Sequence, residues 1–147
     1  MKKALFAGSF DPFTRGHQSI VDRTLAIADE VVVAIGCNAN KRTMLTLEQR
    51  IEAIEQLYAD EPRVKVMAYD GLTTDFAASV GATFLVRGVR NIADFEFEKN
   101  IADVNRKLAG IETVLLVTES EYSHISSSIV RELMSYGRDV SDFMPQK

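Results

Sequence analysis

The chain has 147 residues, of which 46% are hydrophobic and 26% are charged, and its formal net charge is -4 at pH 7. This composition is that of an ordinary globular protein, and the length suits one domain covering residues 1–147. The negative net charge argues against broad attraction to nucleic acid, so an anionic substrate would need locally placed lysines and arginines.

The chain shows no signs of export or of a membrane span. Its single cysteine, Cys37, excludes an internal disulfide bond and fits a reducing compartment. No apolar run approaches the length of about 18 residues that a spanning helix needs, and the apolar run near the N-terminus is too short for a signal peptide. We therefore expect a cytoplasmic protein with no membrane partner.

Strand-like and helix-like patterns alternate along the chain. Short apolar runs predict strands at residues 3–7, 31–35, 63–68, 83–86 and 113–117. Helical periodicity predicts helices over residues 18–29, 46–61, 73–80 and 92–108, and a last helix that Ser126 caps. Thr46 and Gln49 fit a capping box at the start of the second helix, and Thr73 or Thr74 is expected to cap the third.

This alternation predicts an α/β protein with a parallel sheet covered on both faces. We expect a single-domain, Rossmann-like doubly wound fold with five parallel strands in the order 3-2-1-4-5. That order places a switch point between the first and fourth strands, and ligands bind beyond the carboxyl ends of the strands at such a point. The loops after these two strands contain residues 8–17 and 87–90, so we expect the two segments to meet.

The segment after the first strand has the features of a phosphate-binding loop. Gly8 ends the strand, Asp11 and Pro12 mark a turn, and Gly16 and His17 lead into a helix. A helix N-terminus offers unpaired N–H groups and a positive dipole end to a phosphate. The histidine can add a hydrogen bond from its ring, although it also fits a solvated helix start.

Two arginines follow the fourth strand, and we interpret them as ligand-binding residues. Arg87 and Arg90 lie three positions apart, and the planar guanidinium group suits phosphate oxygens. The alternative is a pair of surface salt bridges. Lys41 and Glu98 have similar alternatives. Lys41 fits a lysine in a solvated loop, and Glu98 fits an ion pair with a neighbouring residue on its own helix.

Three serines, at residues 126–128, stand at the start of the last predicted helix. They could cap the helix, and their hydroxyl and N–H groups could also bind an anion. Phe95 and Phe97 are expected in the core, and Cys37 is expected as a small buried residue. His17 and His124 are the only histidines, and no Cys/His/Asp cluster has the spacing of a metal site. We therefore expect no metal site built by the protein.

Three segments together resemble the phosphopantetheine adenylyltransferases of the bacterial type, a family within the nucleotidylyltransferase superfamily. The first reads Gly8-Ser9-Phe10-Asp11-Pro12 followed by Thr14-x-Gly16-His17, and the others are residues 87–96 and 125–132. The likeness runs from residue 3 to residue 145. It implies transfer of the adenylyl group of ATP to 4′-phosphopantetheine in coenzyme A biosynthesis, with dephospho-coenzyme A and pyrophosphate as products. It also implies assistance by Mg2+ and assembly as a homohexamer.

The resemblance implies roles for individual residues as well. Ser9, Lys41, Thr73 and Arg87 would bind phosphopantetheine, and His17, Lys41 and Arg90 would assist the chemistry. The ATP site would comprise Ser9, Phe10, His17, Gly88, Val89, Arg90, Glu98, Tyr122, Ser123, His124, Ile125, Ser126, Ser127 and Ser128. Ser9 stands where the family usually has threonine, and Tyr122 stands where tryptophan is common.

The residues also fit this chemistry without the resemblance. A phosphate acceptor is already ionised, so in-line attack on the α-phosphorus needs positive groups rather than a strong base. Two alternatives remain open. One is a nucleotidylyltransferase that uses nicotinate mononucleotide or glycerol phosphate as acceptor, and the other is a non-catalytic ATP-binding sensor that releases no pyrophosphate.

Overall fold

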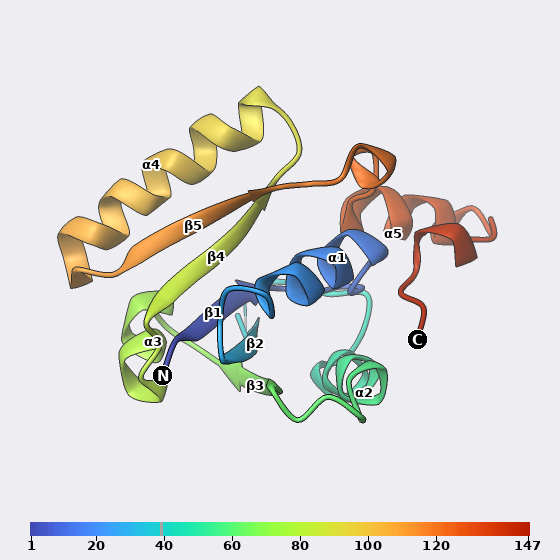
Figure 1. The fold of residues 1–147 in the computed structure, drawn as a ribbon. Coiled ribbons are helices and arrows are strands. Elements are labelled where there is room, and N and C mark those ends of the chain that lie inside the picture. Colours follow the sequence, from blue (N-terminus) through green and yellow to red (C-terminus); the bar gives the residue numbers. More distant parts are fainter. Residues whose placement is uncertain (39) are drawn as a thin grey trace.

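The computed structural model describes residues 1–38 and 40–147, which form one parallel sheet flanked by helices (Figure 1). The strand order β3-β2-β1-β4-β5 confirms the predicted topology. The strands are β1 Lys3–Gly8, β2 Glu30–Gly36, β3 Val64–Tyr69, β4 Phe84–Val89 and β5 Glu112–Val117. The helices are α1 Arg15–Thr24, α2 Leu47–Leu57, α3 Thr73–Val80, α4 Ile92–Ala109 and α5 Ser127–Ser135, with single 3-10 turns η1 Ser120–Tyr122 and η2 Ser141–Phe143.

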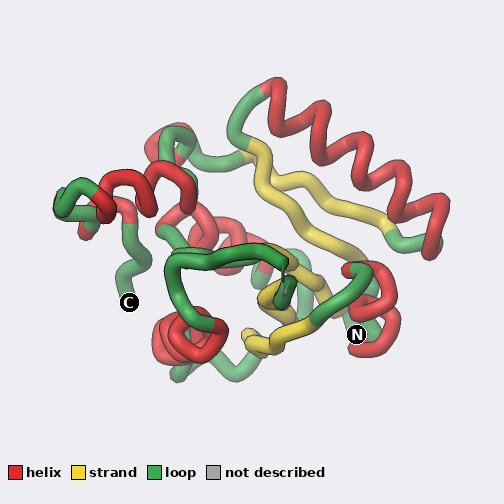
Figure 2. Tube along the Cα trace, turned by 180° about the vertical axis from the view of Figure 1, so that it is seen from behind, coloured by secondary structure: helices red, strands yellow, loops and turns green. Residues whose placement is uncertain are grey.

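The core clusters on the two faces of the sheet both include side chains of β1, because successive side chains of a strand point to opposite sides. On one face, Phe6 of β1 packs in a cluster with Val21 of α1 and Ile54 of α2. On the other face, Leu5 of β1 packs in a cluster with Ala77 of α3. Figure 2 shows from behind how α4 lies along β4 and β5. Among the described residues, no helix is long and apolar enough to cross a membrane.

The sheet divides at the switch point between β1 and β4. β1 pairs with β2 along its whole length, from Lys3 opposite Glu30 to Gly8 opposite Ile35. With β4 it pairs only through Ala4 and Leu5, and β4 then continues beside β5 (Figure 1). The carboxyl halves of β1 and β4 therefore diverge, and they leave an opening at the place where the sequence predicted a ligand site.

Several predicted boundaries differ from the structure, among them the ends of the first two helices, which were predicted at residues 29 and 61 and lie at Thr24 and Leu57. Two of the differences bear on the site. The fourth strand does not end at residue 86, because Arg87, Gly88 and Val89 stay paired with β5 as far as Val117. Arg87 therefore projects from a strand rather than from a loop. The first helix begins at Arg15 rather than at residue 18, because a side-chain cap directly precedes it.

Two other expectations were wrong. Neither Thr73 nor Thr74 caps α3, because its N-cap is Leu72 and no side chain bonds to the free N–H groups there. Phe95 and Phe97 are not core residues: their side chains are 46% and 63% exposed on α4. The prediction for the last helix was correct, since Ser126 caps α5 and its side chain accepts a hydrogen bond from the N–H of Ile129.

Candidate active site

His17 is fixed at the first turn of α1 by a reciprocal capping interaction. The Thr14 N–H donates to Nδ1 of the imidazole at 2.9 Å, and the His17 N–H donates to the Thr14 hydroxyl at 3.4 Å. A ring nitrogen that accepts a hydrogen bond cannot carry the proton. The proton of the neutral ring therefore lies on Nε2, which is left as a donor.

The imidazole is surrounded by three phenylalanine rings, which we call the aromatic cradle. The ring centroids of Phe6, Phe10 and Phe13 lie 6.1, 5.0 and 5.3 Å from that of His17. Burial, together with the positive charges of Arg87 and Arg90, lowers the pKa of His17 from 6.5 to about 3. The imidazole is therefore neutral near pH 7, and it acts as a hydrogen-bond donor rather than as a cation.

Phe10 adopts an uncommon backbone conformation to complete the cradle. Its φ angle is 50°, in the left-handed region that bulky residues rarely occupy. The ring then lies directly under Gly8, where an added Cβ atom would come within 3.0 Å of it. The glycine at the end of β1 is thus needed for close packing of the aromatic ring.

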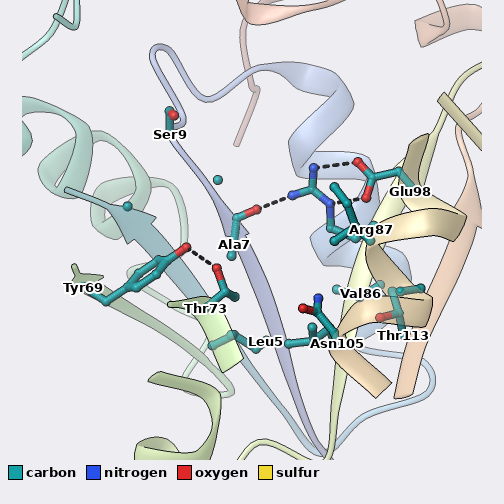
Figure 3. A pocket seen from close by; sticks show the side chains of 15 residues that line it. Leu5, Ala7, Ser9, Tyr69, Thr73, Val86, Arg87, Glu98, Asn105 and Thr113 are labelled. Carbon is teal, nitrogen blue, oxygen red and sulfur yellow. Dashed lines mark hydrogen bonds and ion pairs between the residues drawn. The ribbon is translucent and has the colours of Figure 1, made fainter. Parts of the chain in front are cut away.

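Arg87 bridges the opening between β1 and β4. Its Nε and Nη2 atoms donate to the two carboxylate oxygens of Glu98 at 2.9 and 2.8 Å, and Nη1 donates to the carbonyl oxygen of Ala7 at 2.5 Å (Figure 3). The Glu98 residue on α4 is only 6% exposed. Each terminal nitrogen of Arg87 retains a second N–H, so the guanidinium group is held in place and can still bind an anion.

Lys41 and Ser9, both predicted to hold the acceptor phosphate, are brought together by the fold. The Lys41 ammonium donates to the Ser9 hydroxyl at 2.7 Å. The buried carboxylate of Asp11 accepts the backbone N–H groups of residues 44 and 45, both at 2.8 Å, and so attaches the loop after β2 to the loop after β1. This attachment brings the Lys41 segment to the carboxyl end of the sheet.

Two neighbouring cavities open on this arrangement. The first cavity, of about 360 Å³, lies between the loop after β1 and the starts of α1 and α5. The second cavity, of about 280 Å³, lies between β1, β4, α3 and α4 (Figure 3). Both are lined by Gly8, Ser9, Arg87 and Glu98, so the arginine–glutamate pair forms a shared wall.

The first cavity collects most of the predicted ATP-site residues. Its lining includes Ser9, Phe10, His17, Lys41, Gly88, Arg90, Glu98, Ile125, Ser126, Ser127 and Ser128. Among the described residues, this lining does not include Val89, Tyr122, Ser123 or His124. The His124 ring instead packs edge-on against Phe143 at a centroid distance of 5.8 Å.

The second cavity contains Thr73, which was predicted to contact the acceptor. Its hydroxyl lies 2.8 Å from that of Tyr69, whose ring stacks on Phe76. Most of the remaining lining is apolar, with Leu5, Val86 and Ile101 among its members and Asn105 as a polar group. An elongated, weakly polar group fits such a lining.

The serines at the start of α5 hold that helix start to the loop after β1. The Ser127 hydroxyl donates to the carbonyl oxygen of Pro12 at 2.8 Å. Nη1 of Arg131 donates to the carbonyl oxygen of Asp11 at 2.8 Å, and Nη2 donates to the Ser128 hydroxyl at 3.2 Å. The N–H of Ile129 is taken by the Ser126 hydroxyl, but those of Ser127 and Ser128 have no acceptor within the helix, so they remain available to an anion in the first cavity.

Sequence reasoning missed Arg131 and Arg50 as members of the site. Arg131 lines the first cavity, and a signal was present because it follows Ser128 by one helical turn. Arg50 is buried and donates from Nη1 to the carbonyl oxygen of Ser9 at 2.8 Å. Nothing in the local pattern of α2 pointed to this contact, which spans 41 positions of the chain.

Arg90 bonds to the segment before α5 as well as to α4, since its Nη1 atom donates to the carbonyl oxygen of Ile125 at 3.5 Å. Its Nε atom donates to the carboxylate of Asp94, one turn into α4, at 2.9 Å. Arg90 also lines the first cavity, together with Lys41, Arg87 and Arg131. In residues 1–38 and 40–147, no three histidine, cysteine or carboxylate side chains gather as a set of metal ligands.

Comparison with known proteins first defines the class. A family model described as cytidylyltransferase-like matches residues 5–133. A bifunctional NMN adenylyltransferase/ADP ribose pyrophosphatase from Francisella tularensis superposes with a TM-score of 0.73 at 15% identity, over 97% of this chain and 44% of that one. A putative nicotinate-nucleotide adenylyltransferase from Vibrio parahaemolyticus gives a TM-score of 0.65 at 18% identity, over 99% and 95% of the two chains. These structures share the nucleotidyltransferase fold.

Closer relatives then define the family. The phosphopantetheine adenylyltransferase of Phocaeicola vulgatus is 59% identical over 146 residues, which cover 99% of this chain and 97% of the relative. That of Bacteroides thetaiotaomicron is 57% identical over the same shares. The chain therefore belongs to the phosphopantetheine adenylyltransferase family, and it is an enzyme of the nucleotidyltransferase class.

Proposed function

We propose that this chain transfers the adenylyl group of ATP to 4′-phosphopantetheine, giving dephospho-coenzyme A and pyrophosphate in coenzyme A biosynthesis. Membership of the family supports the reaction. The structural observation that carries the proposal is the pair of neighbouring cavities that share the Arg87–Glu98 wall. One cavity is rich in positive groups and the other is largely apolar, as two unlike substrates that react with each other require.

ATP would occupy the first cavity. Its phosphates would lie near the starts of α1 and α5, where free N–H groups and dipole ends favour anions. Lys41, Arg90 and Arg131 line this cavity and supply positive charge. In this proposal, Gly88, Arg90 and residues 125–128 contact the nucleotide, and Val89 and residues 122–124 support them from outside the cavity lining.

Phosphopantetheine would occupy the second cavity. Its phosphate would lie at the shared rim, where Ser9, Lys41 and Arg87 provide hydroxyl, ammonium and guanidinium donors. The flexible arm would extend between β4 and α4, with Thr73 and Asn105 as the polar contacts along an apolar lining. The few polar groups would fix the orientation of the arm.

The chemistry would be a direct in-line displacement. An oxygen of the acceptor phosphate attacks the α-phosphorus of ATP, and a new P–O bond forms. The bond to the bridging oxygen of the β-phosphate breaks, and pyrophosphate leaves with that electron pair. The Nε2–H of His17 would donate to the α-phosphate as negative charge develops, with Lys41 and Arg90 beside it. The acceptor is already ionised, so none of these residues has to act as a base.

Mg2+ would enter with ATP rather than bind to a site built by the protein. The carboxylates that line the first cavity are already engaged: Asp11 accepts two backbone N–H groups, Asp94 pairs with Arg90, and Glu98 pairs with Arg87. Mg2+ commonly keeps several waters and binds through substrate phosphates. The side chains present therefore do not fit a dedicated magnesium site, and no step of the proposed reaction depends on one.

The acceptor can be tested directly. Pyrophosphate release should be followed with ATP and Mg2+ alone, and then with 4′-phosphopantetheine, nicotinate mononucleotide or glycerol phosphate. We expect rapid release only with 4′-phosphopantetheine. Preferential use of either other acceptor would reject this assignment and leave the ATP site standing. ATP binding without pyrophosphate release from any acceptor would identify a sensor.

A further inference from the structure

We infer that the C-terminal segment, residues 143–147, is a strap that positions His17 from outside the active site. The strap holds the first turns of α1 and covers the outer side of the aromatic cradle. In Figure 1 this segment, drawn in dark red, returns from α5 to lie beside the start of α1. The inference rests on the proposed function in one respect, which is that His17 acts in the transition state.

Hydrogen bonds join the strap to both sides of His17 on α1. The Gln18 amide donates from Nε2 to the carbonyl oxygen of Gln146 at 2.5 Å, and the Gln146 N–H donates back to Oε1 of Gln18 at 3.0 Å. Nε of Arg15 donates to the carbonyl oxygen of Met144 at 3.3 Å. All three bonds use the backbone of the strap, so they fix its path whatever its side chains are.

The strap and the back of the cradle line the same surface groove. Met144 and Pro145 line a surface groove together with Phe10 and Phe13. The same two phenylalanine rings face the imidazole on their other side. Loss of the strap would expose the outer edge of this packing to water and loosen the rings that orient His17.

The far end of the strap is anchored to another part of the active-site wall. The Phe143 ring packs edge-on against His124, at a centroid distance of 5.8 Å. His124 directly precedes Ile125, which lines the first cavity. The strap therefore connects the start of α1 to the segment before α5, which are two walls of the same cavity.

This arrangement explains how a residue in a first helical turn is held firmly enough for catalysis. Helix ends fray because their outer N–H groups lack partners within the helix. Catalytic groups need support that keeps them within about 0.5 Å of their working position. Gln18 and Arg15 are thus positioning residues, which act through His17 and do not touch the substrates.

The test uses two substitutions at one position. Gln146→Pro removes the N–H that donates to Gln18, whereas Gln146→Ala keeps both backbone bonds and serves as the matched control. We expect Gln146→Pro to lower kcat about fivefold, the scale of one lost hydrogen bond, with both KM values within twofold of the parent. Gln146→Ala should match the parent. Equal kcat for the two variants would overturn the inference.

A second comparison separates positioning from a general loss of stability. In a His17→Ala background, Gln146→Pro should cause no further loss of kcat, because its effect passes through the imidazole. The same fivefold loss in both backgrounds would overturn the inference. So would a lower melting temperature accompanied by unchanged kcat.

A third measurement does not depend on the reaction. The ring signals of His17 should be followed by NMR as a function of pH in the parent and in Gln18→Ala, which loses both bonds to Gln146. We expect the midpoint of the His17 titration to rise in the variant, because water gains access to the cradle. An unchanged midpoint would overturn the inference. Failure of the proposed acceptor would instead appear as an inactive parent protein.

Discussion

At the scale of single residues, His17 is a neutral imidazole whose orientation is set by its neighbours. Its Nδ1 atom accepts from the Thr14 N–H, so only Nε2 carries a proton. We expect His17→Ala to retain the fold and to lower turnover by about 10²-fold, the scale of one lost donor to a developing negative charge. Steady-state kinetics and a melting curve check this, and near-normal turnover in a folded variant would exclude the role.

The low pKa of His17 has a consequence for stability. The pKa falls from 6.5 to about 3 on folding, so between these values the unfolded chain binds a proton that the folded chain does not. The free energy of unfolding therefore falls as the pH drops from about 6.5 towards 3. The His17→Asn variant has no imidazole to protonate, so its free energy of unfolding does not fall for this reason. Urea unfolding should show the parent losing about 2 kcal/mol relative to the variant between pH 7 and pH 4.5, and a pH-independent difference would contradict the prediction.

The two arginines that looked alike in the sequence should differ in their effect on stability. Arg87 neutralises a buried carboxylate, so Arg87→Met should lower the free energy of unfolding by about 2 kcal/mol. Arg90→Met breaks a more exposed pair with Asp94 and should cost less than about 1 kcal/mol. Urea unfolding at pH 7 measures both.

The control for Arg87→Met is a second substitution that removes the charge of its partner, Glu98. Adding Glu98→Gln to Arg87→Met removes the unpaired buried charge and should restore part of the lost stability. If the double variant is less stable than Arg87→Met alone, the loss comes from packing rather than from the buried carboxylate.

At the scale of elements, a tyrosine links α2 to α1, the helix that carries His17. The Tyr58 hydroxyl donates to the Asp22 carboxylate at 2.9 Å. Burial raises the pKa of this carboxyl group, and the bond from Tyr58 acts in the opposite direction. Tyr58→Phe should therefore cost about 1 kcal/mol and lower Tm by about 3 °C in a thermal melt. The control is Tyr136→Phe, since Tyr136 is largely exposed. Equal effects would show that the bond contributes nothing.

The elements were predictable from sequence because their signals are local. Runs of β-branched residues between turn residues mark β2, and the Thr46–Gln49 capping box marks the start of α2 in sequence and structure alike. The end of β4 was missed because Arg87 and Gly88 interrupt the apolar pattern. Their pairing with β5 is a contact between distant parts of the chain, which periodicity does not detect.

The candidate site was likewise predictable only in part. The resemblance implied that Ser9 and Lys41 share a ligand, and the strand order accounts for their meeting, because loops at the carboxyl ends of neighbouring parallel strands lie together. The pairing of Arg87 with Glu98 was not predicted from the sequence. Glu98 looked like a helix-surface residue, and its burial depends on how α4 packs over the division between β1 and β4. Such contacts join side chains that share no local pattern.

At the scale of the whole molecule, α4 leaves an apolar surface without a partner in the described chain. Phe97, Ile101, Val104 and Leu108 form this stripe, with exposed fractions of 63%, 39%, 59% and 59%. Their spacing places them on one side of the helix. Apolar helix surfaces of this kind on a protein usually mark an interface. Ile101 also lines the second cavity, so a copy bound to this stripe would sit beside the proposed acceptor site.

We propose that the stripe is buried between copies of this chain in a homohexamer. Val104→Glu places a charge in the stripe, where burial without a partner is costly, and it should dissociate the assembly. The matched control is Lys99→Glu, which introduces the same side chain on α4 but away from the stripe. Light scattering at micromolar concentration should give six times the chain mass for the parent and the control, and a smaller mass for Val104→Glu. A monomeric parent would reject self-association altogether. An intact hexamer in Val104→Glu would place the interface elsewhere, because a glutamate in a tightly packed apolar contact would have to lose its hydration without any compensating partner.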